Sequence, residues 1–183
     1  MSSIDKYCGP ILLLPIWLYQ CLQRDLNTVD GNISSPTGVK NVLICKFFGI
    51  GSIINTAPLI KTIRNAYPHA KIVFLTFLEN KEFILAGHLA DEVIGLNNKS
   101  LFIFLYQTLM AIFKLKKDSF DISIDLEFFS NFSMIISYLS AAQYRHGFIS
   151  HHSSNRLRKK IFTHYSKFNH YRHISRGFLS AAE

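Results

Sequence analysis

The sequence predicts an α/β fold in which a Rossmann-like, doubly wound parallel sheet carries helices on both faces. Short apolar runs that favour strands alternate along residues 40–148 with longer segments whose apolar spacing favours helices. The first run, Val42–Cys45, is continuously apolar, which is typical of a parallel strand covered on both faces. Glycines follow it directly and precede a helix, as in the strand–turn–helix units of such sheets.

The expected elements follow in order from that first strand. Gly49 and Gly51 supply a turn, and Ser52, Thr56 and Pro58 suit the start of the next helix, which favours hydroxyl caps and an early proline. We then expect strands at 71–77, 92–96, 120–127 and 144–148, and helices at 81–86, 100–117, 131–142 and 173–182. The helix at 100–117 is apolar on most faces but short for a bilayer, so we expect it to be buried by packing.

The chain divides into three parts. Residues 1–22 end in the apolar run Ile11–Leu22, which is too short to cross a bilayer and lacks the basic leader of a signal peptide. We therefore expect an amphipathic or apolar helix there, lying on a membrane or on the domain itself. Residues 23–39 are polar and rich in turn formers, which indicates a linker. Residues 40–183 form the Rossmann-like domain.

The chain is basic, with a formal net charge of +8 at pH 7, which favours an anionic partner such as nucleic acid, anionic lipid or a phosphorylated substrate. Most of the excess lies after Tyr144, together with six of the eight histidines. No carboxylate or cysteine stands near these histidines to complete a ligand set, so no metal is expected. Cys8, Cys21 and Cys45 include no CxxC pair, which favours reduced thiols in the cytoplasm.

Two polar segments fall where open α/β sheets bind ligands, beyond the carboxyl ends of strands. The first comprises Lys46, Gly49, Gly51, Ser52 and Asn55, and the second comprises Asp125, Glu127, Ser130 and Asn131. A carboxylate at this position can serve as a general base. The alternative is structural, because the glycines can serve a tight turn and the serine or aspartate can cap a helix or hold a loop.

These residues give the chain a resemblance to glycosyltransferase family 9, the bacterial heptosyltransferase-like enzymes that build lipopolysaccharide cores. The resemblance runs from about Lys40 to the C-terminus. It rests on Lys46, the Gly51-Ser52 pair, the TAPLI run, Arg64 before AYPHAKI, IDLEFFSNFS on the fourth strand and YRHGF on the fifth. The IDKYCGP stretch also looks like an N-terminal extension carried by some members.

The resemblance implies a GT-B enzyme, in which two Rossmann-like domains face each other. Residues 40–183 would be the N-terminal, acceptor-binding half, with the C-terminal donor domain absent and the chain inactive alone. The implied reaction is an inverting, metal-independent transfer of a sugar such as heptose, with no cofactor, because the nucleotide-sugar would bind the missing domain. The implied partners are a phosphorylated glycolipid acceptor, the inner face of the cytoplasmic membrane and a C-terminal half on a separate chain. Nucleic acid is not expected.

The chain departs from the family's sequence pattern at the position of the candidate base. Members commonly have Gly-Asp at the turn, with the aspartate proposed as base, whereas this chain has Gly51-Ser52. Serine cannot remove a proton unaided, so either the role of base passes to Glu127 or Asp125, which we favour, or the protein uses this site only for binding. The other candidates would bind substrate: cations hold acceptor phosphates or carboxylates, and polar groups bond sugar hydroxyls. They are Lys46, Gly49, Gly51, Ser52, Asn55, Arg64 and Asn131.

Two other functions stay open. In an NAD(P)-binding Rossmann oxidoreductase, Gly49 and Gly51 would begin the GxGxxG fingerprint and Glu79 would bind ribose, but Ile54 occupies the third glycine position. A non-catalytic adaptor would use the basic tail to bind an anionic membrane or nucleic acid. The transferase hypothesis requires that the loop after the first strand and the acidic end of the fourth open into the same cleft.

Overall fold

The computed structural model describes residues 38–128, 130–149, 156–169, 171 and 173–182. The N-terminal helix expected at 1–22 and all but the end of the linker at 23–39 lie outside these residues, as do His151, His152 and His170 of the basic tail.

The described chain alternates strands and helices, as expected. The strands are β1 (Asn41–Cys45), β2 (Lys71–Phe77), β3 (Glu92–Leu96), β4 (Ile122–Asp125), β5 (Tyr144–Ile149) and β6 (His164–Lys167). The helices are α2 (Ile50–Ile54), α3 (Ala57–Ala66), the 3₁₀ turn η1 (Leu78–Asn80), α4 (Lys81–Ala86), α5 (Leu101–Asp118), α6 (Asn131–Leu139), α7 (Arg156–Ile161) and α8 (Ile174–Leu179). The strands form one parallel sheet in the order β3-β2-β1-β4-β5-β6, which confirms the Rossmann-like α/β fold.

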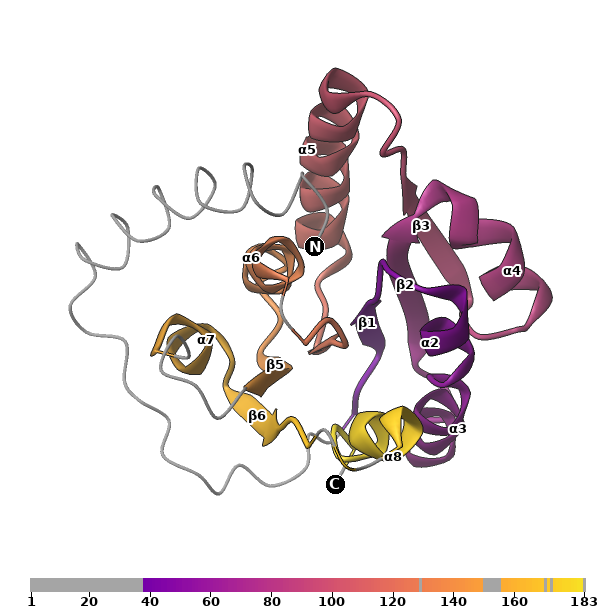
Figure 1. The fold of residues 1–183 in the computed structure, drawn as a ribbon, viewed down its shortest axis with the longest axis vertical. Coiled ribbons are helices and arrows are strands. Elements are labelled where there is room, and N and C mark those ends of the chain that lie inside the picture. Colours follow the sequence, from indigo (N-terminus) through magenta and orange to yellow (C-terminus); the bar gives the residue numbers. More distant parts are fainter. Residues whose placement is uncertain (1–37, 129, 150–155, 170, 172, 183) are drawn as a thin grey trace.

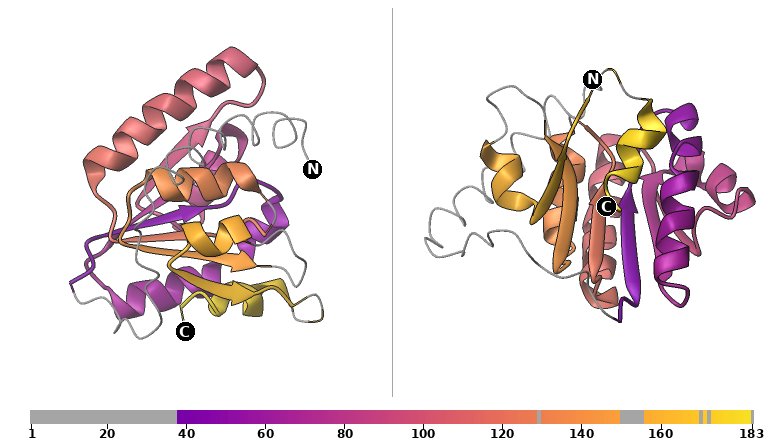
Figure 2. Two further views of the ribbon diagram at one scale, coloured as in Figure 1. Left: turned by 90° about the vertical axis from the view of Figure 1, so that its left-hand side faces the viewer. Right: turned by 90° about the horizontal axis from the view of Figure 1, so that it is seen from below.

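Helices cover both faces of the sheet (Figures 1 and 2). On one face, Ile44 and Phe74 of the central strands pack in the same apolar cluster as Leu59 of α3 and Phe178 of α8. The opposite face has a second cluster, formed by Leu43 and Leu75 from the strands, Phe104 from α5 and Phe132 and Ile136 from α6. Successive residues of β1 point to opposite faces and enter the two clusters in turn, which explains why Val42–Cys45 are all apolar.

The order of the strands reverses between β1 and β4. From β1 the chain builds outward through β2 and β3, then returns through α5 to place β4 on the other side of β1. Cys45 at the end of β1 pairs in register with Asp125 at the end of β4. The two carboxyl ends are therefore neighbours, at the position where such sheets bind ligands.

Three local features differ from the sequence-based expectations. Helix α7 and strand β6 were not expected, because the strand is a polar HYSK segment at the edge of the sheet, without an apolar run. Strand β4 ends at Asp125, short of the expected 127. The helix after β1 is divided into α2 and α3, and the Thr56 hydroxyl at the break donates to Ile53 O (2.6 Å) without capping α3.

Helix α5 packs on the sheet through Phe104, Thr108, Ala111 and Leu115, while much of its remaining apolar surface is exposed. The expectation of a buried packing helix therefore holds for one face only. Among the described helices, none has both the length and the apolar character needed to cross a bilayer.

Candidate functional site

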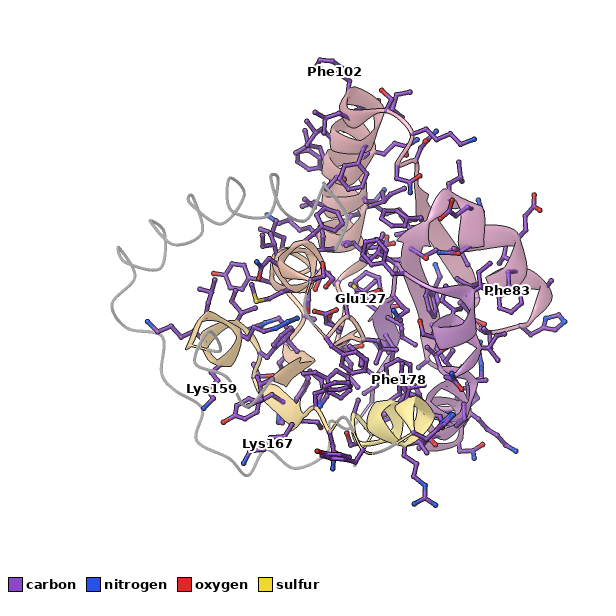
Figure 3. All side chains as sticks on the ribbon, in the orientation of Figure 1. Phe83, Phe102, Glu127, Lys159, Lys167 and Phe178 are labelled. Carbon is purple, nitrogen blue, oxygen red and sulfur yellow. The ribbon has the colours of Figure 1, made fainter. Side chains whose placement is uncertain are left out.

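The loop after β1 and the acidic end of β4 meet in a buried ion pair. Lys46 Nζ lies 2.7 Å from Glu127 Oε1, and the two side chains are only 5% and 10% exposed. The same carboxylate oxygen accepts the backbone N–H groups of Phe47 (2.8 Å) and Phe48 (2.9 Å). Lys46 also donates to Phe48 O (2.7 Å). Glu127 thus fixes the conformation of residues 46–48. The two strand ends lie side by side, with Glu127 next to β1 (Figure 3), but the side chains that meet there are almost sealed from solvent, so a cleft shared by the two ends stays a prediction.

Lys46 is itself buried, although lysine side chains rarely enter a protein core. Its burial is explained by its two oxygen partners, since a buried ammonium group is tolerated when it is paired and hydrogen-bonded. The burial of Lys46 could not be predicted from the sequence, because its partner Glu127 lies 81 residues away along the chain.

Asp125 lies deeper than Glu127 and is fully buried. Its Oδ1 accepts the backbone N–H of Glu127 (3.0 Å), and its Oδ2 lies 3.4 Å from the guanidinium of Arg158. Burial raises the pKa of the Asp125 carboxyl to about 7, although Arg158, the Glu127 N–H and the Ser133 hydroxyl each lower it. Asp125 therefore holds the loop after β4, as the structural alternative proposed.

Arg158 of α7 is a residue of this site that the sequence reasoning did not single out. Its guanidinium donates to the carbonyl oxygens of Phe128 (3.2 Å), Glu127 (3.0 Å) and Ser130 (3.3 Å) as well as approaching Asp125. It is 7% exposed despite its charge. One side chain therefore joins the end of β4 to the start of α6 and fixes the loop that carries Glu127.

Asn80, in the turn after β2, was also missed. Its side-chain Nδ2 donates to Phe47 O (3.0 Å) and to Thr76 Oγ1 (2.9 Å), and the residue is buried. The loop after β1 is thus held from β2 on one side and from β4 on the other. An asparagine that follows a buried strand is a polar signal that sequence reasoning could have used.

The glycine turn follows this anchored loop. Gly49 has φ 80°, a conformation that only glycine adopts easily, whereas Gly51 lies inside α2 with open space beside it. The Ser52 hydroxyl donates to Phe48 O (2.7 Å) and Gly49 O (2.8 Å), and Asn55 Nδ2 donates to Gly51 O (2.9 Å). Both side chains are partly exposed near the carboxyl edge of the sheet.

Asn131 and Arg64 occupy different places relative to this site. Asn131 is the first residue of α6, directly after Ser130, whose side chain accepts the Ser133 N–H (3.2 Å) and caps the helix. Arg64 ends up at the amino edge of the sheet, because α3 runs back against the strands. There it pairs with Asp91 (2.9 Å), which also accepts the Ile72 N–H near the start of β2. The structure therefore does not bring Arg64 to Lys46.

Cys45 lies beneath the ion pair, in the last position of β1. Burial and the nearby carboxylates of Asp125 and Glu127 raise the pKa of its thiol well above the ordinary value, so it remains protonated. Among the described residues, no group of three His, Cys, Asp or Glu side chains is placed to hold a metal ion. The chemistry available at this edge of the sheet is thus that of a carboxylate, a lysine, an arginine and backbone amides.

Fold and site together define a Rossmann-like α/β domain with buried charged groups at the switch point of its sheet. No family model matches the chain, and no curated protein matches it. Solved structures with the same fold include the glycosyl transferase family 9 protein from Veillonella parvula DSM 2008 (18% identity, TM-score 0.65). They also include E. coli heptosyltransferase WaaC with ADP-2-deoxy-2-fluoro heptose (15%, 0.61) and with ADP (17%, 0.60).

Each of these alignments covers 78% of the chain but only 40%, 47% and 45% of the respective solved structure. The chain therefore spans less than half the length of the proteins that it resembles. At these identities the likeness establishes the fold. It is nevertheless a likeness to the family that the sequence motifs indicated, and it does not favour the oxidoreductase or adaptor alternatives.

Proposed function

We propose that the chain is the acceptor-binding part of an inverting, metal-independent glycosyltransferase that moves a sugar from a nucleotide-sugar to a phosphorylated glycolipid acceptor. The observation that carries this proposal is the Lys46–Glu127 pair, in which a carboxylate is held at the junction of β1 and β4. Support comes from the shared fold of family 9 structures, one of them a heptosyltransferase with an ADP-sugar analogue.

Glu127 is the better candidate for the general base. Asp125 has no exposed surface and both of its oxygens have partners, so an acceptor hydroxyl cannot reach it. The Glu127 side chain keeps 10% of its surface exposed, and its Oε1 is held by three donors. A fixed carboxylate at hydrogen-bond distance from an acceptor hydroxyl can remove its proton as the hydroxyl oxygen attacks the anomeric carbon and the nucleoside diphosphate leaves.

The remaining roles follow from position. The half-exposed Ser52 and Asn55, together with Asn131 at the start of α6, would bond sugar hydroxyls. Lys46 would contribute positive charge next to an anionic acceptor group while keeping Glu127 in place. Arg64 would take no part, because it lies at the opposite edge of the sheet and is paired with Asp91.

The donor would bind a second unit, because the solved structures are more than twice as long as the part matched here. That unit would be a C-terminal half on a separate chain or in a longer polypeptide. A lipid-linked acceptor would place the complex at the inner face of the cytoplasmic membrane.

Calorimetry on the full chain tests the acceptor role. We expect binding of a phosphorylated lipopolysaccharide-core acceptor and no binding of ADP-heptose or NAD⁺. Binding of ADP-heptose or NAD⁺ in place of the acceptor would overturn the proposal in favour of a donor or dinucleotide domain.

A transfer assay with a donor-binding half supplied in trans tests the base. Glu127→Gln keeps an oxygen that can accept from Lys46 and from the Phe47 and Phe48 N–H groups. With its fold verified by circular dichroism, this variant should therefore retain acceptor affinity and lower the transfer rate by roughly 10²–10⁴-fold, the usual contribution of a general base. The matched control is Glu79→Gln, an exposed glutamate beyond β2, which should leave the rate unchanged. Normal transfer by Glu127→Gln would exclude Glu127 as the base.

A further inference from the structure

Helix α5 carries two apolar stripes on nearly opposite sides. The buried stripe, Phe104, Thr108, Ala111 and Leu115, faces the sheet and α6. The second consists of Phe102, Tyr106, Leu109 and Phe113, which are 84, 63, 56 and 65% exposed. Phe102 lies at the far end of the helix from the rest of the domain (Figure 3). We call these four residues the outer stripe of α5.

The outer stripe has the spacing of a helix-packing surface. Its residues follow one another at intervals of four, three and four, the same intervals as in the buried stripe, so they form one continuous row along the helix. No element of the described chain covers this row. Leu101, Ile103, Leu105 and Met110 beside the row are exposed as well, by 37–52%, so the apolar face is broader than the row itself. Exposed apolar faces of this kind mark contact surfaces.

We propose that the outer stripe of α5 is the docking surface for the chain's own apolar run Ile11–Leu22. The two partners match in character, because residues 11–22 contain no charged side chain and neither does α5 from Leu101 to Phe113. An aliphatic segment with one tryptophan and one tyrosine can fill the spaces between the large side chains of the stripe. Docking would cover the apolar surface of both partners.

The position at which the described chain begins supports this pairing. The Asn41 side chain donates to Asp118 O (2.9 Å) and Ser119 O (3.3 Å), so the chain enters the sheet beside the C-terminal end of α5. Residues 23–37 connect this point to the apolar run, and fifteen residues can extend to about 50 Å. Helix α5, with 18 residues, is only about 27 Å long. A tether of this length gives the segment a millimolar effective concentration at the stripe.

An anionic membrane is the main rival occupant, and the charges of α5 argue against it. Helices that lie on membranes carry basic residues along the flanks of the apolar face. On α5 the cations Lys114, Lys116 and Lys117 are confined to the end of the helix, and Lys114 is engaged by Glu92 (2.8 Å). A second copy of the chain is the other rival occupant. Its binding would depend on protein concentration, whereas docking of the tethered segment would not.

The single tryptophan of the protein, Trp17, lies in the proposed segment and reports on its surroundings. In the full chain without lipid, we expect Trp17 fluorescence to be shielded from acrylamide at every protein concentration. The variant Leu109→Lys/Phe113→Lys should raise the quenching constant several-fold. The matched control, Phe83→Lys/Leu85→Lys, changes exposed apolar residues on α4 and should leave quenching unchanged, with circular dichroism verifying the fold of both variants.

Three outcomes would overturn the proposal. Shielding that appears only as protein concentration rises would assign the stripe to a second copy. Shielding that appears only after phosphatidylglycerol vesicles are added would assign it to a membrane. Equal quenching in the wild-type protein and the α5 variant would show that Trp17 does not contact the stripe.

Discussion

The two edges of the sheet both carry ion pairs, but they differ in their access to water. At the carboxyl edge, Lys46–Glu127 is at most 10% exposed, and Arg158 and Asp125 are buried as well. At the amino edge, the pair Arg64–Asp91 is 35 and 41% exposed. Solvent screens the charges of an exposed pair such as Arg64–Asp91, whereas removing one member of a buried pair leaves a desolvated charge. Burial therefore decides which charges the domain depends on.

The largest effect is expected from breaking the buried pair. Lys46→Met should lower the free energy of unfolding by about 3–5 kcal/mol, because Glu127 is left buried without its cation. Urea unfolding measures the change. Lys46→Met/Glu127→Gln should recover much of the loss, because no unpaired charge remains and the glutamine oxygen can still accept the Phe47 and Phe48 N–H groups. The control is Lys71→Met, which breaks the more exposed pair between Lys71 and Glu92 at the amino edge. A loss as large as that of Lys46→Met would contradict the comparison.

The next effect concerns pH. Because the pKa of Asp125 is raised to about 7 in the folded protein, its neutral form is favoured, and the stability it contributes is present at low pH and lost as pH rises through 7. Over the range from about pH 4 to 8 this loss amounts to at most about 4 kcal/mol. His146 acts in the opposite sense, because burial lowers its pKa to about 4 and stability is lost as pH falls.

The contribution of Asp125 is therefore measured as the difference in unfolding free energy between the wild type and Asp125→Asn. The contribution of His146 is the same in both proteins and cancels in this difference. Chemical unfolding at several pH values should show wild-type stability falling relative to the variant as pH rises. A difference that does not change with pH would show that Asp125 does not titrate in this range.

A smaller effect separates the two glycines of the turn. Gly49→Ala should lower the free energy of unfolding by about 1–2 kcal/mol, because its φ of 80° is strained for any residue with a Cβ atom. Gly51→Ala is the matched control: it lies inside α2, no atom lies within 4 Å of an added Cβ, and alanine favours helix. Thermal unfolding compares the two, and equal losses would refute the requirement for glycine at 49.

The smallest effect is expected at the amino edge. Arg64→Ala should lower the free energy of unfolding by only about 0.2–1 kcal/mol, because its pair with Asp91 is exposed and screened. Raising the salt concentration should reduce this difference further. A calorimetric titration with the acceptor should show unchanged affinity, and a loss of affinity would place Arg64 in the site after all.

The sequence predicted those strands of the sheet that contain an apolar run. Strands β1, β2, β3 and β5 were found within a residue or so, because apolar runs and turn residues are local signals. Strand β6 lies at the edge with alternate residues exposed, so it carries no such run. The adjacency of Lys46 and Glu127 followed from the general rule for strand ends, but their direct contact depends on side-chain packing.

Arg158 could not be distinguished by sequence from the basic residues around it. Its partners precede it by 28–33 residues, and only the packing of α7 against α6 directs this one cation inward. The same limit explains Arg64, whose charge suggested an acceptor contact although α3 carries it to the other edge.

The contact between Arg158 and Asp125 can form only after the segment that contains Arg158 has been translated. The ribosome adds Arg158 33 residues after Asp125, so a nascent chain that already has β1 and β4 has no guanidinium to compensate that carboxyl. Until α7 has been synthesised, the loop with Glu127 lacks the donor that ties its carbonyl groups together. The part of the domain around Glu127 therefore gains its last buried cation late, after the central strands have been made.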